Sequence, residues 1–344
     1  MRTHLFTILS IALFGQLAFN PSLGASTITV NTEADIIDTP ECTLREAIAS
    51  VNSGGALGGC VAVGDGVPDT VVLPAGNYIL SQSQPGTEDN CGEGDLDVLA
   101  NLTLNGAGSG VTTVSASGLQ PDDPERVFNI NPFGSSDISV TFNGVTIRDG
   151  DDFAGGGIQI VGEQPDFVSF VKAGGFGSTV SVVLNDVVVN ENTAFLDGGG
   201  INNLGADLTL NNSQVTQNQA QEISGGGISH QGGCFKCVDA ALLVVNLGGL
   251  LTLQNTTVSG NSAVLGGGVY NQAELVMDSS TVSDNTAGND GGGIYDAFGA
   301  LALITNSTIS GNQALGENNP LLVLPDMKLG FFPNDGAGGG IYQL

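Results

Sequence analysis

The stretch NTTVSGNSAVLGGGVYN, residues 255–271, decides the fold of this chain. Nearly the same pattern returns as SSTVSDNTAGNDGGGIYD at residues 279–296. In both copies, three adjacent glycines stand between segments whose apolar and β-branched residues are typical of strands. Adjacent glycines cost backbone entropy, so a sequence that keeps them at regular positions needs a backbone shape that other residues resist.

The same two patterns recur along the C-terminal part of the chain. Triple glycines begin at Gly155, Gly198, Gly225, Gly266, Gly291 and Gly338. An eleven-residue segment precedes each triplet: VTFNGVTIRDG (140–150), VVLNDVVVNEN (182–192), LTLNNSQVTQN (208–218), LTLQNTTVSGN (251–261), LVMDSSTVSDN (275–285) and ALITNSTISGN (302–312). Apolar residues occupy its first, third and eighth positions, except that Ala302 stands first in the last copy. The closest triplets define a unit of about 25 residues, and the wider spacings add an insertion.

A repeat of this length indicates a solenoid, a propeller or another array. Apolar residues two positions apart, as in Leu251 and Leu253, exclude helical repeats. A propeller blade needs about 40 residues and four longer strands, whereas each unit here predicts three short strands. We therefore predict an all-β fold, a parallel β-helix. Side chains such as Leu275, Met277 and Val282 are expected to stack inward on their counterparts one turn away.

The glycines and a recurring asparagine are predicted to shape the corners between strands. Glycine enters left-handed backbone conformations without strain and lets neighbouring turns approach closely. Asparagine tolerates the left-handed conformation, satisfies turn amides through its side chain and is expected to stack into an amide ladder. Structural roles are therefore assigned to Asn192, Asn218, Asn261, Asn285 and Asn312, and to Gly198, Gly225, Gly266 and Gly291.

Residues 1–25 have the pattern of a secretory signal peptide. A short basic start, MRTH, precedes the apolar run LFTILSIALFGQLAF, and small residues follow before Ser26. The run is shorter than the ~20 residues that cross a bilayer, so export is favoured over a membrane anchor. Cleavage is expected after Ala25. The protein is therefore predicted to be secreted or held at the cell surface, without membrane insertion after cleavage.

The segment that follows, residues 26–62, is predicted to form an N-terminal cap. STITVNT alternates like a strand, and TLREAIASV (43–51) has the pattern of a short amphipathic helix. Thr43 is the expected cap of this helix, and Glu46 completes a capping box. A solenoid needs such an element to cover its exposed first turn. The remainder, residues 63–344, is assigned to the β-helix, with insertions near residues 159–180, 229–249 and 313–337.

Several motifs before the repeats occur in a fixed order. They are CTLREAI (42–48), DTVVLPAGNYIL (69–80), GDLDV (94–98) and LTLNGAG (102–108), followed by the GGGI units. Together they resemble exported bacterial proteins with the CSLREA domain, which are similar to the repeats of polymorphic outer-membrane proteins. Thr43 replaces the usual serine of that family and keeps the capping hydroxyl. The resemblance implies a right-handed parallel β-helix and export, but no particular activity.

Acidic residues dominate the charge, with 35 Asp and Glu against seven Lys and Arg and a formal net charge of −28. Such a charge repels nucleic acids and acidic polysaccharides. Elimination on an acidic polysaccharide also needs basic residues, which are scarce. Arg45 is expected to be a surface or packing residue of the cap helix, and Arg148 is expected to pair with neighbouring aspartates. Hydrolysis by a carboxylate pair remains open.

Cys234 and Cys237 lie close together beside His230, the one histidine beyond residue 25. These three residues, with Asp239 as a fourth, have a spacing that would suit a metal site. In an oxidising compartment, a disulfide between the two cysteines is favoured over zinc.

The other three of the five cysteines lie nearer the N-terminus. Our hypothesis is a disulfide between Cys42 and Cys60, which pins the cap helix and leaves Cys91 free.

Acidic loops concentrate oxygen ligands beside glycines, as in RDGDD at residues 148–152. Its carboxylates, Asp149, Asp151 and Asp152, are weak calcium candidates. No loop matches a complete calcium-binding pattern, and a solvated acidic surface that keeps an exported protein soluble is the favoured interpretation. No cofactor is otherwise expected.

These features favour an exported structural, adhesin-like binding protein of the cell surface or extracellular space. Variable insertions on a rigid scaffold suit binding of an extracellular ligand, either a glycan or a surface protein. The alternative is a carbohydrate-active enzyme on the same fold, a polysaccharide lyase or a glycoside hydrolase. The sequence leans against catalysis, and no catalytic residue is assigned.

Overall fold

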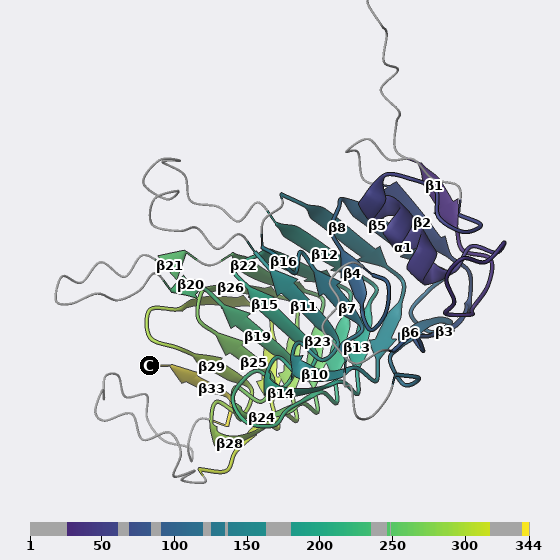
Figure 1. The fold of residues 1–344 in the computed structure, drawn as a ribbon. Helices are drawn as coiled ribbons and strands as arrows, with labels where there is room; N and C mark the ends of the chain where they lie inside the picture. The colour runs from purple at the N-terminus through teal and green to yellow at the C-terminus, as the bar shows by residue number, and fades with distance from the viewer. Residues whose placement is uncertain are drawn as a thin grey trace, which may run out of the picture.

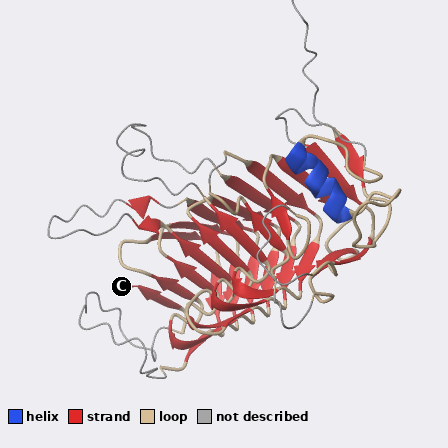
Figure 2. Cartoon of the chain, viewed as in Figure 1, coloured by secondary structure: helices blue, strands red, loops and turns tan. Residues whose placement is uncertain are grey.

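The computed structural model describes residues 26–60, 69–83, 91–119, 125–134, 137–162, 180–234, 246–247, 249–316 and 339–343. In these residues the chain winds as a coil of short strands along one axis, with a single helix at one end (Figure 1 and Figure 2). The strands form four parallel sheets and one short antiparallel pair. The predicted parallel β-helix is confirmed. The predicted signal peptide lies outside the described residues, within which no helix is long and apolar enough to cross a membrane.

From β8 (Ser139–Asn143) onward, each turn of the coil passes through four sheets in the same order, which we number first to fourth, and the two turns before it have no strand in the third sheet. The first sheet contains β1 (Thr27–Thr29), β2 (Asp69–Leu73), β5 (Leu102–Gly106), β8 (Ser139–Asn143), β12 (Ser181–Asn185), β16 (Asp207–Asn211), β22 (Leu250–Gln254), β26 (Glu274–Asp278) and β30 (Leu301–Thr305). The second contains β3 (Gly76–Ile79), β6 (Thr112–Ser115), β9 (Thr146–Arg148), β13 (Val188–Asn190), β17 (Gln214–Thr216), β23 (Thr257–Ser259), β27 (Thr281–Ser283) and β31 (Thr308–Ser310).

The third and fourth sheets complete each turn. The third contains β10 (Asp151–Ala154), β14 (Thr193–Asp197), β18 (Gln219–Ala220), β24 (Ser262–Leu265), β28 (Thr286–Asp290) and β32 (Gln313–Ala314). The fourth contains β4 (Leu96–Val98), β7 (Phe128–Ile130), β11 (Ile158–Val161), β15 (Ile201–Leu204), β19 (Ile228–Gln231), β25 (Val269–Asn271), β29 (Ile294–Asp296) and β33 (Ile341–Gln343). The remaining strands, β20 (Gly233–Cys234) and β21 (Asn246–Leu247), pair antiparallel.

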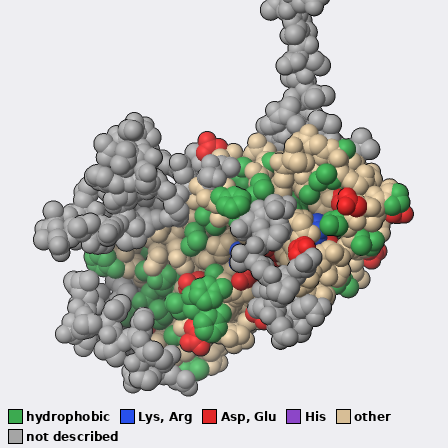
Figure 3. Space-filling view, in the orientation of Figure 1, with side chains coloured by type: hydrophobic (Ala, Val, Ile, Leu, Met, Phe, Trp, Pro, Cys, Tyr) green, Lys and Arg blue, Asp and Glu red, His purple; other side chains and the backbone are tan. Residues whose placement is uncertain are grey.

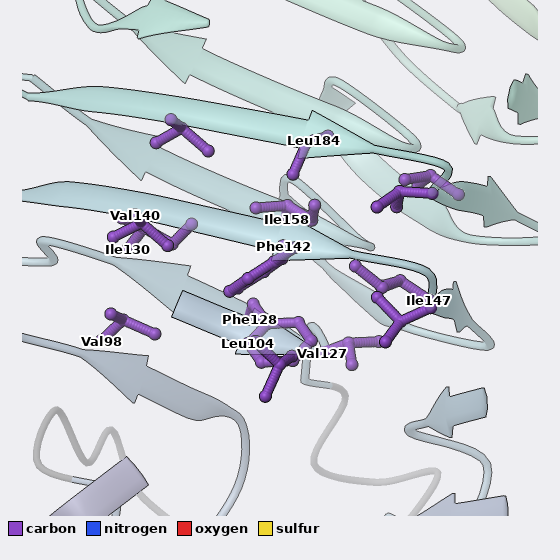
Figure 4. Close-up of a cluster of buried hydrophobic side chains, with 14 of the residues drawn as sticks. Val98, Leu104, Val127, Phe128, Ile130, Val140, Phe142, Ile147, Ile158 and Leu184 are labelled. Carbon is purple, nitrogen blue, oxygen red and sulfur yellow. The ribbon is translucent and has the colours of Figure 1, made fainter. Parts of the chain in front are cut away.

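The core consists of columns of apolar side chains from successive turns. Leu208, Leu251 and Leu275 pair in direct register and are all buried. Phe128 and Phe142 meet with ring centroids 4.7 Å apart, and Figure 4 shows them among buried residues of neighbouring turns. One turn alone leaves its apolar face exposed, so stacking the turns is what buries this surface.

The prediction of three strands in each turn is wrong, because a fourth short strand lies between the asparagine corner and the glycines. This segment has no apolar alternation that would mark it as a strand. It pairs nevertheless with the same segment one turn away, as Ser262 with Thr286 and Ala263 with Ala287. Backbone hydrogen bonds between stacked turns therefore define the third sheet, and local propensity does not.

The predicted insertion bounds near 159, 229 and 313 are set too early. The first residues of these ranges still belong to β11, β19 and β32, which pair in register with neighbouring turns. Within the second range, β20 and β21 form the antiparallel pair. The segments 163–179, 235–245 and 317–338 lie outside the described residues.

The triple glycines and the asparagine ladder form one packed corner. Asn218 receives a 3.0 Å hydrogen bond on Oδ1 from Nδ2 of Asn192, and Nδ2 of Asn218 donates to Oδ1 of Asn261 at 3.0 Å. The ladder continues through Asn285 to Asn312 with steps of 2.9 Å. The predicted amide ladder is therefore present, and each of its Oδ1 atoms that receives a side-chain amide also receives a backbone N–H.

The backbone at this corner differs from the prediction in one respect. The left-handed residue is the one before each asparagine, as at Glu191, Gln217 and Asp284, whose φ angles are 56°, 57° and 55°. The first glycine of each triplet does adopt the left-handed conformation, as at Gly225 and Gly266 with φ of 65° and 60°. The asparagine is thus kept for its amide and not for its tolerance of that conformation.

Candidate functional site

The helix α1 (Leu44–Ser53) packs against β2 and β4 at one end of the coil. The backbone N–H of Glu46 donates to Oγ1 of Thr43 at 3.1 Å, and the N–H of Thr43 donates back to Glu46 Oε2 at 3.3 Å, so the capping box is present. Cys42 and Cys60 form the expected disulfide, and Cys91 is free and buried. The side chains of Cys234 and Cys237 lie outside the described part of the chain.

Arg45 is fully buried and holds the segment that leads into the fourth sheet. Its guanidinium donates to both carboxylate oxygens of Asp35, at 2.7 and 3.1 Å. It also donates to the carbonyls of Glu93, Gly94 and Asp95, at 3.0, 2.8 and 3.0 Å. Arg45 is therefore a packing residue of the end of the coil and not a surface residue, and it fixes the position of Asp95.

The outward face of the fourth sheet carries one continuous column of side chains, which we call the outer column. Strand pairing aligns its members in direct register: Asp97, Asn129, Gln159, Asn202, Ser229, Tyr270, Tyr295 and Tyr342. Their strand neighbours point into the core, so alternation along the strand directs these residues outward. The column is polar in its N-terminal part and aromatic in its C-terminal part.

The outer column is largely covered because the triple glycine folds back over it. A Cβ on Gly198 would lie 2.7 Å from Cα of Asn202, and one on Gly291 would lie 2.7 Å from Cβ of Tyr295. The chain therefore makes its sharp turn directly against the column, and only a residue without a side chain fits there. The glycines thus shape the surface of this face as well as the corner.

Three tyrosines of the outer column form a continuous stack. The ring centroids of Tyr270 and Tyr295 are 5.3 Å apart at 11°, and those of Tyr295 and Tyr342 are 5.2 Å apart at 15°. Burial raises the pKa of Tyr295, with the neighbouring rings and Asp290 acting in the same direction. The hydroxyls therefore stay neutral and provide both hydrogen-bond donors and acceptors.

An exposed apolar group, which we call the phenylalanine patch, lies on the third sheet. It consists of Phe153, Phe195 and Ile223, whose exposed fractions are 61%, 47% and 38%. The two phenylalanine rings are in contact, with centroids 5.8 Å apart. Figure 3 shows hydrophobic side chains gathered over this part of the molecule, with acidic groups beside them. The outer column on the fourth sheet and the phenylalanine patch by the third sheet lie on either side of the triple-glycine corner, and we call the two together the binding face.

Buried hydrogen-bond acceptors without a partner occur on the same face. They include Oδ1 of Asn129 and of Asn202 in the outer column, and Oδ1 of Asp95, two residues before Asp97. A buried acceptor that lacks a donor costs about 1–3 kcal/mol, so each such group needs an explanation.

Three carboxylates meet at the N-terminal end of the binding face. One oxygen each from Asp95, Glu125 and Asp152 lies within 4.8 Å of the others. Arg126 Nε donates to Asp152 Oδ2 at 2.6 Å and lies 3.6 Å from Asp95 Oδ2. Burial raises the pKa of Asp95 well above its usual range, Asp97 adds to this, and Arg126 opposes it.

The calcium candidates predicted from RDGDD do not come together. Asp149 accepts a 2.9 Å bond from Arg148 Nε and a 2.7 Å bond from the Ser115 hydroxyl. Asp151 is exposed, and Asp152 turns to Arg126. The predicted pairing of Arg148 with a neighbouring aspartate is therefore confirmed, whereas Asp152 has a different set of neighbours from those that the loop suggests.

His230, considered as a metal ligand, is an interior residue of β19. Its ring lies between Asn203, whose Nδ2 is 3.0 Å from Nδ1, and the carbonyl of Gly249, which is 2.9 Å from Nε2. A neutral ring with its proton on Nε2 satisfies both contacts. Burial lowers the pKa of His230 to about 4. The ring is therefore neutral at pH 7 and serves the core.

The buried His230 predicts acid sensitivity. Because its pKa is near 6.5 in the unfolded chain and lower when folded, its neutral form contributes stability that is complete above pH 6.5 and is lost as pH falls toward 4. Between pH 7 and 4, the wild type should lose roughly 2–3 kcal/mol more unfolding free energy than His230→Gln. Urea unfolding at several pH values measures this, and equal losses in both proteins would contradict it.

The tyrosine stack was missed at the sequence level, although a signal existed. Tyrosine follows the triplet at the same position in GGGVY, GGGIY and GGGIY, at Tyr270, Tyr295 and Tyr342. In a repeat protein, identical residues at one repeat position stack in space. The cluster of Asp95, Glu125 and Asp152 has no such signal, because its members occupy unrelated positions in the less regular first turns.

No protein-family model matches this sequence, and no curated protein is similar to it. Among solved structures, ORF18 of Geobacillus virus E2 is similar at 9% identity and a TM-score of 0.22. The similarity covers 72% of this chain and 53% of that one, so this chain spans about half the length of the viral protein. A similarity at this level carries no argument about fold or function.

Proposed function

We propose that this chain is an exported, adhesin-like binding protein whose binding face holds neutral glycans of a cell surface or extracellular material. The proposal includes a right-handed coil and a lid role for α1, which packs on β2 and β4 at one end. The disulfide between Cys42 and Cys60 is compatible with an oxidising, extracellular location. The pattern of residues 1–25 and the resemblance to CSLREA proteins support export.

The exposed pair of Phe153 and Phe195 is the observation that carries the proposal. Aromatic rings provide a flat apolar surface at low cost in side-chain entropy, and the C–H face of a sugar ring is its natural complement. The stacked tyrosines add aromatic rings on the fourth sheet, which follows the third sheet in each turn.

Charge decides which glycans are bound. With a formal net charge of −28, the protein repels uronic-acid or sulfated polymers at moderate ionic strength. Neutral polysaccharides are not subject to this repulsion. The proposal therefore names neutral hexose polymers as the ligand class.

The test is a panel of neutral and acidic polysaccharides, offered to protein that starts at Ser26. We expect the protein to bind at least one neutral polysaccharide. Phe195→Ala should weaken its affinity for that polysaccharide at least about tenfold. Because Phe195 is exposed, the substitution should leave the fold intact. Phe298→Ala is the matched control, since Phe298 is also exposed, at 55%, but is not part of the binding face.

Two outcomes would overturn the assignment. Retention by no neutral polymer, or equal effects of the two phenylalanine substitutions, would exclude the binding face as a glycan site. Release of soluble sugars during the assay would favour the rival carbohydrate-active enzyme. The close carboxylates of Asp95, Glu125 and Asp152 are the feature that favours this rival. Arg126 bonds to Asp152 and lies 3.6 Å from Asp95, and this pairing speaks against a free acid pair.

A further inference from the structure

The three carboxylates at the N-terminal end of the binding face come from three successive turns of the coil. Asp95 immediately precedes β4, Glu125 lies before β7, and Asp152 belongs to β10. Their nearest oxygens are all within 4.8 Å of one another. Like charges at this separation repel, so their approach needs compensation by positive charge.

Arg126 is the described cation whose side chain bonds to a carboxylate of this cluster. Arg126 bonds to Asp152 and approaches Asp95 through the same Nε atom. Arg45 is also near Asp95, but its guanidinium pairs with the carboxylate of Asp35. Its contact with Asp95 is a hydrogen bond to the backbone carbonyl and not to the carboxylate. Among the described residues, the guanidinium of Arg126 thus interacts with all three carboxylates of the cluster.

A second, independent observation is that the side chain of Asp95 is buried with one oxygen that has no hydrogen-bond partner. This residue is only 4% exposed, and its Oδ1 atom is buried without a hydrogen-bond partner. A buried carboxylate oxygen without a donor is costly unless the charge is paired or coordinates a metal. Arg45 donates a hydrogen bond to the backbone carbonyl of Asp95 and so fixes the backbone at this residue.

We propose that Asp95, Glu125 and Asp152 bind a calcium ion. Calcium takes oxygen ligands at about 2.3–2.6 Å, so two oxygens on opposite sides of it are about 4.8 Å apart. All three carboxylates therefore fit one calcium coordination sphere, and waters or carbonyls complete it. The site is independent of the proposed glycan binding.

The site joins three successive turns, which the stacked strands, Arg126 and a backbone hydrogen bond from Asp151 to Glu125 also connect. An ion held by residues before β4, before β7 and in β10 links three turns where the repeat is least regular. Ion binding should therefore stabilise the folded protein, because a ligand that binds only the folded state shifts the unfolding equilibrium.

The experiment is calorimetric titration of the protein from Ser26 with calcium chloride after chelator treatment, with thermal unfolding as the second measurement. We expect binding that Asp95→Asn weakens at least about tenfold, because ligand charge sets calcium affinity. Asp151→Asn is the matched control, since Asp151 is an exposed neighbour outside the cluster. Its affinity should equal that of the wild type.

Glu125→Gln is the second test variant, because Glu125 is only partly buried and its replacement is less damaging to the fold. It should weaken calcium binding as Asp95→Asn does. Absence of calcium binding by the wild type would overturn the proposal. So would equal affinities in Asp151→Asn and Glu125→Gln, since binding would then depend on overall acidity and not on the cluster.

Discussion

Gly227→Ala should lower the unfolding free energy by about 3 kcal/mol, although it adds a single methyl group. A Cβ at this position would lie 2.6 Å from the carbonyl oxygen of Gly268 and 3.0 Å from Nδ2 of Asn261. That carbonyl accepts the N–H of Gly227 at 3.1 Å and of Ile228 at 2.9 Å, so it has no freedom to retreat. The methyl group must separate two turns or displace a ladder amide, and either change breaks buried hydrogen bonds.

The loss of stability in Gly227→Ala is expected because the neighbouring turn lies so close to Gly227, and not because of the backbone conformation of Gly227. Gly227 has no positive φ, so alanine is allowed there by its dihedral angles. Gly110→Ala is the matched control, because a Cβ at Gly110 meets nothing within 4 Å and its φ is likewise unexceptional. This control should change stability by less than about 1 kcal/mol. Urea unfolding compares the two, and similar losses in both would refute the account of the corner.

Arg45→Met should lower the unfolding free energy by about 3–5 kcal/mol. Methionine retains much of the apolar stem but leaves the carboxylate of Asp35 without its cation. The carbonyls of Glu93, Gly94 and Asp95 also lose their donor in a buried place. Removing one partner of a buried ion pair costs far more than the pair contributes, because the remaining charge stays desolvated.

Arg148→Met is the control for this substitution. Arg148 also pairs with two carboxylates, those of Asp149 and Glu191, but its side chain is 39% exposed and solvent screens the charges. Its replacement should cost no more than about 1 kcal/mol. Hydrogen exchange gives a second measurement, since Arg45→Met should also speed exchange in the segment that precedes β4. Equal stability losses in the two variants would show that the buried contacts of Arg45 do not stabilise this end of the coil.

The regular part of the fold was predictable because each turn repeats the same chemical pattern. The alternation of Leu251 and Leu253 marks a strand with one buried face, and five asparagines at one repeat position predict a ladder. Thr43 and Glu46 predict a helix start from only four residues of sequence. In each case the interaction is either local or repeated, so one copy of the pattern is informative about the others.

The irregular part was not predictable from sequence alone. The third sheet escapes detection because Ser262, Thr286 and their equivalents form strands only by pairing with another turn. The burial of Arg45 depends on carbonyls nearly 50 residues away in the chain. The meeting of Asp95 with Asp152 likewise follows from how the early turns stack, and no spacing in the sequence encodes it.

By itself, the sequence determined that this chain is a coil of short parallel strands, since regular glycines, asparagines and alternating apolar residues permit no other periodic packing. Only the tertiary structure decided which side chains share the binding face and which carboxylates meet. The physical reason is that the first property depends on repetition along the chain, which periodicity reveals. The second depends on distances between residues of different turns, which exist only once the turns have stacked.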